Sequence, residues 1–550
     1  MSARPWRVRT TTITAALLAG GLLSGGLAAC GGGSSGAGGS SGSAGVLTVT
    51  TGAAGTFADD FNLYSTNAED PTNGMIYEPL FFFDTAKDGV VKPWLGTSYA
   101  WSGGGKTVTV QLRHNVKWTD GKPFTSADVV FTFNQAIHSV ALNKFGLPLA
   151  SVAADGAYAV TINFTKPAYT DAYFALGRVE MLPQHIWGSI SDPATFLNAH
   201  PVGTGAYEVG SFSGQAFTMT ANPHYYLPGL PKFKTIRFLA FSGNTTSDAA
   251  IESGQVDWAG SYIPGIQKLY LAKNKKFVVS DIPLSTAFLV PNMVSGPTAN
   301  LAVRQAISAA LDRSAISNTV YNGYASPTNP EALILPNYSA VLDPSLAGAR
   351  FSAPDAATAR NILARAGVKT PLSLTVDMVS GYTDYLSDLQ IIQAELKPAG
   401  INLTIDQPAY ATFTSLQDTG KFQLLMDNFG YTPDPWAYYY SILDSAIAPP
   451  IGQPDTVGNY GRYHNPQVDS LLNQIAGTTD PAVQKPDFEQ IEHIFAAQLP
   501  DIPLFNQQDE IEFNGNVVAN YPSVANPYGA PAVYIQPDIG WVAARLAPAQ

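Results

Sequence analysis

The stretch LRHNVKWTDGKPFTSADV, residues 112–129, decides the fold class because it joins the end of a strand to the start of a helix. Leading into it, residues 106–113 alternate Thr and Gln with Val and Leu, which is the period of a half-buried strand. Residues 120–121, Asp-Gly, predict a turn. Residues 125–128, Thr-Ser-Ala-Asp, resemble a capping box, and the apolar residues after them recur at helical spacing. A strand, a turn and a helix therefore follow one another.

The same alternation of elements continues along the chain. Residues 160–164 predict a short strand, and residues 299–320 predict one helix with an apolar stripe. Residues 385–396 predict a further helix that is closed by a proline and a glycine, and residues 402–405 predict the strand after it. Strands and helices mixed along the whole chain predict an α/β protein with mixed sheets and flanking helices.

The N-terminal segment is unlike the rest of the chain. It has three arginines and no acidic residue, and an apolar stretch over residues 13–27 follows them. This stretch is shorter than the ~20 apolar residues of a membrane-spanning helix, and the order of its parts is that of a signal peptide. We therefore expect a signal peptide over residues 1–29. Residues 27–30, Leu-Ala-Ala-Cys, resemble a bacterial lipobox, which implies that Cys30 is lipidated and becomes the first mature residue.

The segment after Cys30 contains only Gly, Ser and Ala, so it has nothing to bury in a core. We expect residues 30–45 to be a flexible tether. A lipidated cysteine followed by a tether predicts a protein held on the extracellular face of a bacterial membrane. Loss of the signal peptide changes the formal charge from -12 to -15, which disfavours nucleic acid as a partner. Cys30 is the only cysteine, so no internal disulfide is possible.

About 505 residues remain after the tether, which is too many for a single core and predicts two or more lobes. The seven histidines are scattered and no nucleophile, acid–base or metal-ligating constellation is present, so we expect no enzyme activity, no cofactor and no metal site. Aromatic residues make up 11% of the chain, with 26 Tyr, which is enough to line a ligand cleft as well as a core.

Five segments in chain order carry a resemblance to a known family. They are residues 74–80 (GMIYEPL), 112–129, 201–207 (PVGTGAY), 303–313 (VRQAI followed by ALDR) and 459–472. Together they resemble the bacterial solute-binding proteins of ABC transporters called family 5, the oligopeptide-binding type. They span nearly the whole mature chain.

The resemblance implies a two-lobed clamshell in which binding, not covalent chemistry, is the activity. Domain I would comprise residues 46–290 and a C-terminal return over residues 505–550, and domain II would comprise residues 291–504. The crossovers near residues 289–290 and 505–506 would form the hinge. A monomer would capture a small ligand and deliver it to a membrane permease.

The ligand site is where the sequence departs from the family pattern. Relatives that bind peptides hold the ligand's amino group with an acid in a segment ending in Asp-Pro, and the position of that acid here falls on Tyr431. Asp434 could take its place, and the segment otherwise supplies aromatic surface. The expected ligand-contacting residues are Phe429, Tyr431, Asp434 and Trp436 of this segment, Asn292 at the crossover, and Glu78 and Asn62 of domain I. We expect Trp436→Ala to weaken binding and to leave folding intact.

Three functions follow from these observations. The first is an importer binding protein for short peptides, which is the activity of most of the family. The second is the same role with an oligosaccharide, favoured by the missing acid and by the aromatic residues. The third is a surface sensor or adhesin that kept the fold and lost its transporter.

Overall fold

The computed structural model describes residues 45–550, except residues 53–54, 66, 88–89, 322–324, 336, 347–350, 352, 431 and 456. For residues 281–284 and 508–509 only the backbone is described. Residues 43–550 form one compact unit. The expected signal peptide, the lipidation site Cys30 and all of the tether except Gly45 lie outside the described residues. None of the described helices has both the length and the apolar character that a membrane span requires.

An eleven-stranded sheet organises this unit. Its strand order is β15-β14-β16-β12-β17-β11-β1-β10-β9-β8, and β13 pairs with β17 beside that path. In this order the strands are β15 Ile401–Asp406, β14 Leu372–Asp377, β16 Leu424–Gly430, β12 Phe277–Pro291, β17 Ile502–Asn514, β11 Trp258–Gly260, β1 Val46–Thr50, β10 Thr235–Leu239, β9 Ala216–Ala221, β8 Tyr207–Ser213 and β13 Ala325–Pro327.

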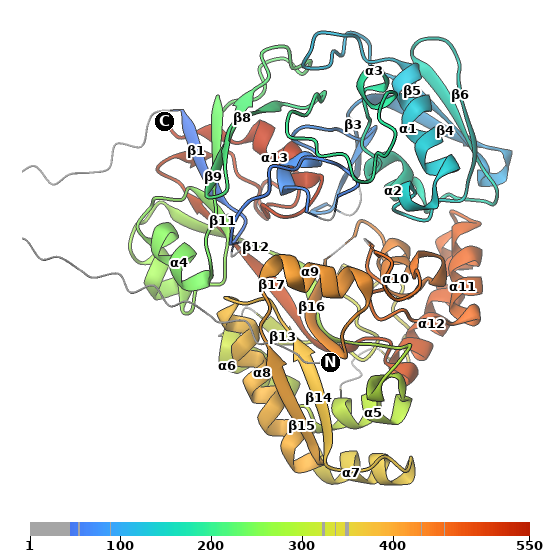
Figure 1. Cartoon of the computed structure of the whole chain (residues 1–550), viewed down its shortest axis with the longest axis vertical. Coiled ribbons are helices and arrows are strands. Elements are labelled where there is room, and N and C mark those ends of the chain that lie inside the picture. The colour runs from blue at the N-terminus through green and yellow to red at the C-terminus, as the bar shows by residue number, and fades with distance from the viewer. Residues whose placement is uncertain are drawn as a thin grey trace, which may run out of the picture. The chain divides into compact units, whose positions relative to one another are not determined.

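The two longest strands, β12 and β17, connect the two lobes (Figure 1). They pair antiparallel from Phe277 opposite Asn514 to Leu289 opposite Ile502. Towards one end of this ladder β17 pairs with β11, and towards the other end β12 pairs with β16. We call the elements on the β11 side lobe I and those on the β16 side lobe II.

Lobe I confirms the local elements expected around residues 112–129. The expected strands are β5 Thr107–Leu112 and β7 Ala159–Phe164, which lie in a four-stranded sheet with β4 Gly96–Ser102 and β6 Leu149–Ala154. Helix α1, Ser126–His138, begins at a capping box in which the Thr125 amide donates to Asp128 at 2.9 Å. The remaining strands and α-helices of lobe I are β2 Phe81–Asp84, β3 Val90–Pro93, β18 Val518–Ala519, β19 Ala547–Pro548, α2 Ala172–Gly177, α3 Gln184–Trp187, α4 Asn244–Glu252 and α13 Asp538–Arg545.

Lobe II corrects one sequence prediction. The single helix expected over residues 299–320 is two helices, α5 Leu301–Ala310 and α6 Arg313–Tyr321. Leu311 is extended between them, with ψ at 130°, and the Asp312 carboxylate accepts from the amides of Ser314 and Ala315 at 3.1 and 3.0 Å. An aspartate that satisfies these free amides starts a new helix. The expected helix and strand that follow are confirmed as α8 Thr383–Leu396 and β15; the others are α7 Ala356–Arg365, α9 Tyr410–Thr419, α10 Pro435–Leu443, α11 Pro466–Ala476 and α12 Pro481–Gln498.

The apolar core is divided unevenly between the lobes. One buried cluster lies mainly in lobe II, where α5, α6, α7 and α8 pack with β14, β15 and β16, and it includes residues of β12 and β17 (Figure 1). The largest cluster begins in lobe I and continues into α10, α11 and α12. The two lobes therefore share a packed contact on the α10 side.

Candidate functional site

The lobes meet in an aromatic contact beside α10. The Tyr440 hydroxyl of lobe II donates to the Phe145 carbonyl oxygen of lobe I at 2.8 Å. Trp436 stacks on Tyr440 with ring centroids 4.7 Å apart, and Phe174 of lobe I lies 5.5 Å from Tyr440. We call these four residues, Phe145, Phe174, Trp436 and Tyr440, the aromatic clasp. Because it joins both lobes, the structure is a closed arrangement.

A second contact joins the lobes at α4. The Asn244 amide donates to the Gly381 carbonyl oxygen at 3.1 Å, and the Asn244 side chain donates to Asp384 at 3.1 Å. The backbones approach so closely that a Cβ on Gly243 would lie 3.2 Å from the Gly381 Cα. Larger side chains at these two glycines would push the lobes apart at this point.

A cavity of about 320 Å³ lies beside the aromatic clasp and is lined by both lobes. Tyr169 and Thr170 contribute from lobe I, and the Tyr169 amide also donates to the Ala476 carbonyl oxygen of lobe II at 3.3 Å. The lobe II lining includes Tyr338, Asp434, Trp436 and Phe488. A ligand group in this interlobe cavity contacts both lobes at once.

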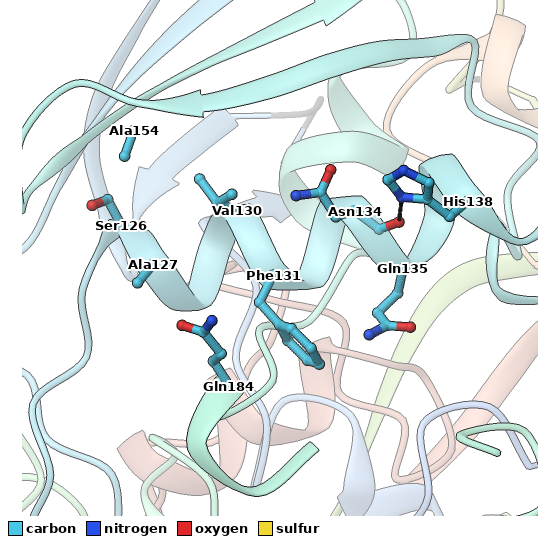
Figure 2. Close-up of a pocket in the computed structure, with 9 residues that line it drawn as sticks. All are labelled: Ser126, Ala127, Val130, Phe131, Asn134, Gln135, His138, Ala154 and Gln184. Carbon is cyan, nitrogen blue, oxygen red and sulfur yellow. Dashed lines mark hydrogen bonds between the residues drawn. The ribbon is translucent and has the colours of Figure 1, made fainter. Parts of the chain in front are cut away.

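A larger depression of about 520 Å³ runs along α1 (Figure 2). Its lining comes from α1, from Ala154 of β6 and from Gln184 of α3, all of which belong to lobe I. A ligand held there would touch only one lobe and could not stabilise closure. The smaller interlobe cavity is therefore the better candidate for the functional site.

Two of the residues expected from the sequence, Asp434 and Trp436, come together in the interlobe cavity. Asp434 is the N-cap of α10, its carboxylate accepts from the Ala437 amide at 2.8 Å, and burial raises its pKa to about 6. Trp436 is only 3% exposed and its indole N–H donates to the Leu472 carbonyl oxygen at 2.8 Å. Because this buried indole joins α10 to α11, the structure leads us to expect that Trp436→Ala lowers stability, whereas the sequence-based expectation was an intact fold.

Phe429 lies apart from that cavity lining, on β16. Its half-buried ring is 6.2 Å from the Tyr460 ring, and a Cβ on Gly458 would lie 1.8 Å from it. Tyr431, the residue at the family's amine-binding position, lies outside the described residues. The ligand roles of both residues remain predictions.

The other three expected residues are enclosed by the protein. Asn292 donates to the carbonyl oxygens of Gly420 and Phe422, and Asn62 donates to those of Pro193 and Phe196, at 2.8–3.0 Å. Glu78 is fully buried, and burial raises its pKa to about 7. Its carboxylate accepts from Trp94, Thr204, Tyr225 and Tyr226 at 2.6–3.0 Å. These partners give all three side chains a structural role, so the ligand roles expected for them rest on the sequence alone.

The structure adds two acids that sequence reasoning did not select. Asp427 on β16 and Asp70 of lobe I are both half-buried, and burial raises the pKa of each to about 7. The negative charges of both carboxylates also raise the pKa of Tyr382 and of Tyr410, so the two acids lie near the same pair of tyrosines. Neither acid takes part in an ion pair with a described basic residue.

Asp427 precedes Tyr431 and Asp434 in the segment that ends in Asp-Pro, yet no local pattern distinguishes it from Asp434. Its side chain is fixed by the Asn428 amide at 2.9 Å and by the Gln417 side-chain amide. Among the residues that the structure describes, no three His, Cys, Asp or Glu side chains are grouped so as to hold a metal ion.

The fold, with its two lobes and the cavity between them, is that of a two-lobed binding protein. The family model of the bacterial extracellular solute-binding proteins, family 5, matches residues 90–449, and the chain belongs to that family. It is 27% identical to the glutathione-binding protein GsiB of Escherichia coli K12 over 443 residues, which are 78% of this chain and 82% of that protein.

Solved structures give the same fold. The mannohexaose-bound periplasmic oligopeptide-binding protein of Thermotoga maritima superimposes with a TM-score of 0.84 at 25% identity, over 92% of this chain and 99% of that one. The oligopeptide-binding protein AppA of Bacillus subtilis, in complex with a nonapeptide, gives 0.78 at 22% identity over 92% and 99%. These findings confirm the two-lobed α/β fold. The chain is an extracellular solute-binding protein of the ABC-transporter type and not an enzyme.

Proposed function

We propose that this protein is the lipid-anchored substrate-binding component of an ABC importer and that it captures a short peptide between its lobes. The observation that carries this proposal is the interlobe cavity, whose lining comes from Tyr169 and Thr170 of lobe I and from Asp434 and Trp436 of lobe II. A ligand that contacts both lobes stabilises the closed state over the open one, and the permease then binds the closed form.

The hinge of this motion lies in the ladder of β12 and β17. Domain I would comprise residues 46–290 and 505–550, and domain II residues 291–504. The register of the ladder shifts between Pro283 and Ser285 and again between Ala287 and Phe288, close to the expected crossovers. Irregular pairing weakens a ladder locally, so bending there disturbs the fewest regular hydrogen bonds.

The anchor and the tether place the binding protein near its permease. Lipidated Cys30 would hold the chain on the outer face of the membrane, and residues 30–45 would let a monomer move between ligand capture and docking. The composition of this segment, with only Gly, Ser and Ala after the cysteine, supports that role.

A peptide is favoured over a sugar by Asp427 and Asp70, two acids that form no ion pair with a described basic residue. Peptides carry an ammonium group, and a half-buried carboxylate without a basic partner is stabilised by one. Asp427 would supply the acid that is missing at Tyr431, with Asp70 approaching from lobe I. Asp427→Asn should therefore weaken peptide binding at least tenfold and leave sugar binding unchanged, as measured by titration calorimetry.

An oligosaccharide is the second candidate, because the aromatic lining of the interlobe cavity suits the apolar faces of sugar rings. The Thermotoga maritima relative, which holds mannohexaose, supports this alternative. A sensor or adhesin is the third, and it predicts that no importer genes lie beside this one.

A thermal-shift screen tests the proposal. The compact unit from Ser43 onward is mixed with short peptides and with cello-, xylo- and malto-oligosaccharides. A ligand at a hundredfold excess over its Kd stabilises the native state by ~2.7 kcal/mol. Shifts with peptides support the proposal, shifts with sugars alone replace the peptide by the sugar, and no shift with any of them removes the transport role.

A further inference from the structure

A polar network crosses from lobe I to lobe II at the α4 contact. The Asp384 carboxylate of α8 accepts from the Asn244 side chain at 3.1 Å, and the Asn244 carbonyl oxygen accepts from the Ser247 hydroxyl at 2.9 Å. The Ser247 and Ser261 hydroxyls lie 3.0 Å apart, and the Ser261 hydroxyl donates to Asp248 of α4 at 2.9 Å. Two carboxylates from opposite lobes therefore stand at the two ends of one network, which we call the α4 seam.

A third carboxylate joins the seam from the connecting strand β17. The Ser261 amide donates to the Glu512 carboxylate at 3.3 Å, and the other Glu512 oxygen is buried without a hydrogen-bond partner among the described residues. The three seam acids, Asp248, Asp384 and Glu512, are 7%, 5% and 1% exposed. None of them forms an ion pair with a described basic residue. Ionised carboxylates are costly to bury in this way.

The titratable groups around the seam acids are mostly acids and tyrosines. Glu252 lies on α4 with Asp248 and is paired with Lys273. Asp388 lies one turn after Asp384 on α8 and is fully buried. The other groups whose charge interacts with the seam acids are Glu510, Tyr262, Tyr270, Tyr321, Tyr382 and Tyr385. An acid that ionises here therefore meets other acids, and Lys273 is already engaged by Glu252.

The closed state disfavours ionisation of these acids. Burial, together with the negative charges of Glu252 and Asp384, raises the pKa of Asp248 from its ordinary 3.8 to about 7. Burial also raises the pKa of Asp384 to about 6 and that of Glu512 well above its ordinary value. Opening parts Asp384 from Asn244 and admits water, so the pKa values of the seam fall towards their ordinary range. The closed state therefore holds protons that the open state releases.

We propose that the α4 seam is an acid-dependent latch: protonated seam acids let α4 close on α8, and their ionisation favours separation of the lobes. Because the closed state has the raised pKa values, the latch is strongest at low pH and weakens as pH rises from about 4 to about 7. This goes beyond the proposed function, since it concerns when the lobes close and not which ligand they hold.

The test measures closure in the ligand-free unit from Ser43 onward. Spin labels are placed on Val140→Cys of lobe I and Val483→Cys of lobe II, two exposed positions, and their distance distribution is recorded at pH 5 and pH 7. We expect the closed-to-open ratio to fall at least about threefold between these two pH values. In Asp248→Asn, which keeps an oxygen to accept from Ser261 but cannot ionise, the fall should be less than about half as large.

Asp257→Asn is the matched control. Asp257 is also 7% exposed, and burial raises its pKa to about 6. Its carboxylate accepts from the Thr48 amide at 3.0 Å and from the Asn514 side chain at 3.1 Å, and these partners lie in lobe I. Asp257→Asn should therefore alter the pH dependence of unfolding and leave that of closure unchanged.

Thermal unfolding at both pH values shows whether each variant folds. If Asp248→Asn does not fold, Asp384→Asn, which keeps an oxygen to accept from Asn244, takes its place. A wild-type distance distribution that is the same at pH 5 and pH 7 refutes the latch, whether the lobes stay open or closed. Equal pH responses of the seam variant and of Asp257→Asn refute it as well. Because no ligand is present, either failure leaves the proposed binding function standing.

Discussion

Tyr440→Phe should shift the protein towards its open state without unfolding it. The Tyr440 hydroxyl crosses from lobe II to the Phe145 carbonyl oxygen of lobe I at 2.8 Å, inside the aromatic clasp. When the lobes part, water can replace this bond on both sides. In the closed variant, the Phe145 carbonyl oxygen would stay buried without its donor. The substitution therefore raises the free energy of the closed state relative to the open one.

The size of the effect follows from the buried bond. A neutral hydrogen bond contributes about 0.5–1.5 kcal/mol net, and a buried acceptor left without a donor costs about 1–3 kcal/mol. We therefore expect Tyr440→Phe to disfavour closure by about 1–2 kcal/mol. Ligand affinity should fall by about 5- to 30-fold, since each 1.4 kcal/mol is tenfold in Kd.

The neighbouring residue supplies a matched control. The Tyr439 hydroxyl donates to the Glu331 carbonyl oxygen at 2.9 Å, and both residues belong to lobe II. Tyr439→Phe therefore removes the same group from the same helix without touching the contact between lobes. It should lower the free energy of unfolding by about 1 kcal/mol and leave ligand affinity within twofold of the wild type.

Closure can be measured without knowing the ligand. Val140 of lobe I and Val483 of lobe II are 95% and 57% exposed, and the unit from Ser43 onward has no cysteine, so both can be replaced by cysteine and spin-labelled. We expect Tyr440→Phe to lengthen the mean distance between the labels and Tyr439→Phe to leave it unchanged. Equal distance distributions for the two variants, or equal losses of affinity, would refute the role of the clasp.

Three further predictions concern stability and are measured by denaturant or thermal unfolding. Trp436→Ala should lower the free energy of unfolding by roughly 3–5 kcal/mol, because it empties a buried site between α10 and α11. Glu78→Gln should cost roughly 2–4 kcal/mol, because an amide cannot accept from all four donors. In the folded wild type the pKa of Glu78 is about 7, against an ordinary 4.5 in the unfolded chain, so the folded state holds this proton more tightly. The contribution of Glu78 to stability therefore falls as pH rises from about 4.5 to about 7. Glu78→Gln should lack this fall. Gly203→Ala should prevent folding or lower the Tm sharply, because its Cβ would lie 1.9 Å from the Ile76 carbonyl oxygen; a wild-type Tm would contradict this.

Local elements were predictable where their hydrogen-bond partners lie nearby in sequence. The cap of α1 joins Thr125 to Asp128, so a four-residue pattern contains the whole interaction. The break between α5 and α6 was missed because the apolar period runs through Leu311 and hides the cap at Asp312. A capping residue inside a periodic stretch therefore deserves as much weight as the period itself.

The candidate site was less predictable because its side chains are placed by contacts between distant segments. Tyr438, Tyr439 and Tyr440 are consecutive and all buried. The Tyr438 hydroxyl donates to Ala332 and the Tyr439 hydroxyl to Glu331, both within lobe II, whereas the Tyr440 hydroxyl donates across the lobes to Phe145. No local pattern separates these three roles.

Trp436 connects the two parts of the site. One side of its indole stacks on Tyr440 within the aromatic clasp, and the same residue lines the interlobe cavity. A ligand group bound in the cavity therefore lies beside a side chain whose position already depends on contact with lobe I. Ligand binding and lobe closure then stabilise the same indole, so each strengthens the other. The ligand and the clasp therefore favour the same closed state. By linkage, a variant that weakens the clasp raises the free energy of the closed state and lowers the apparent affinity for the ligand.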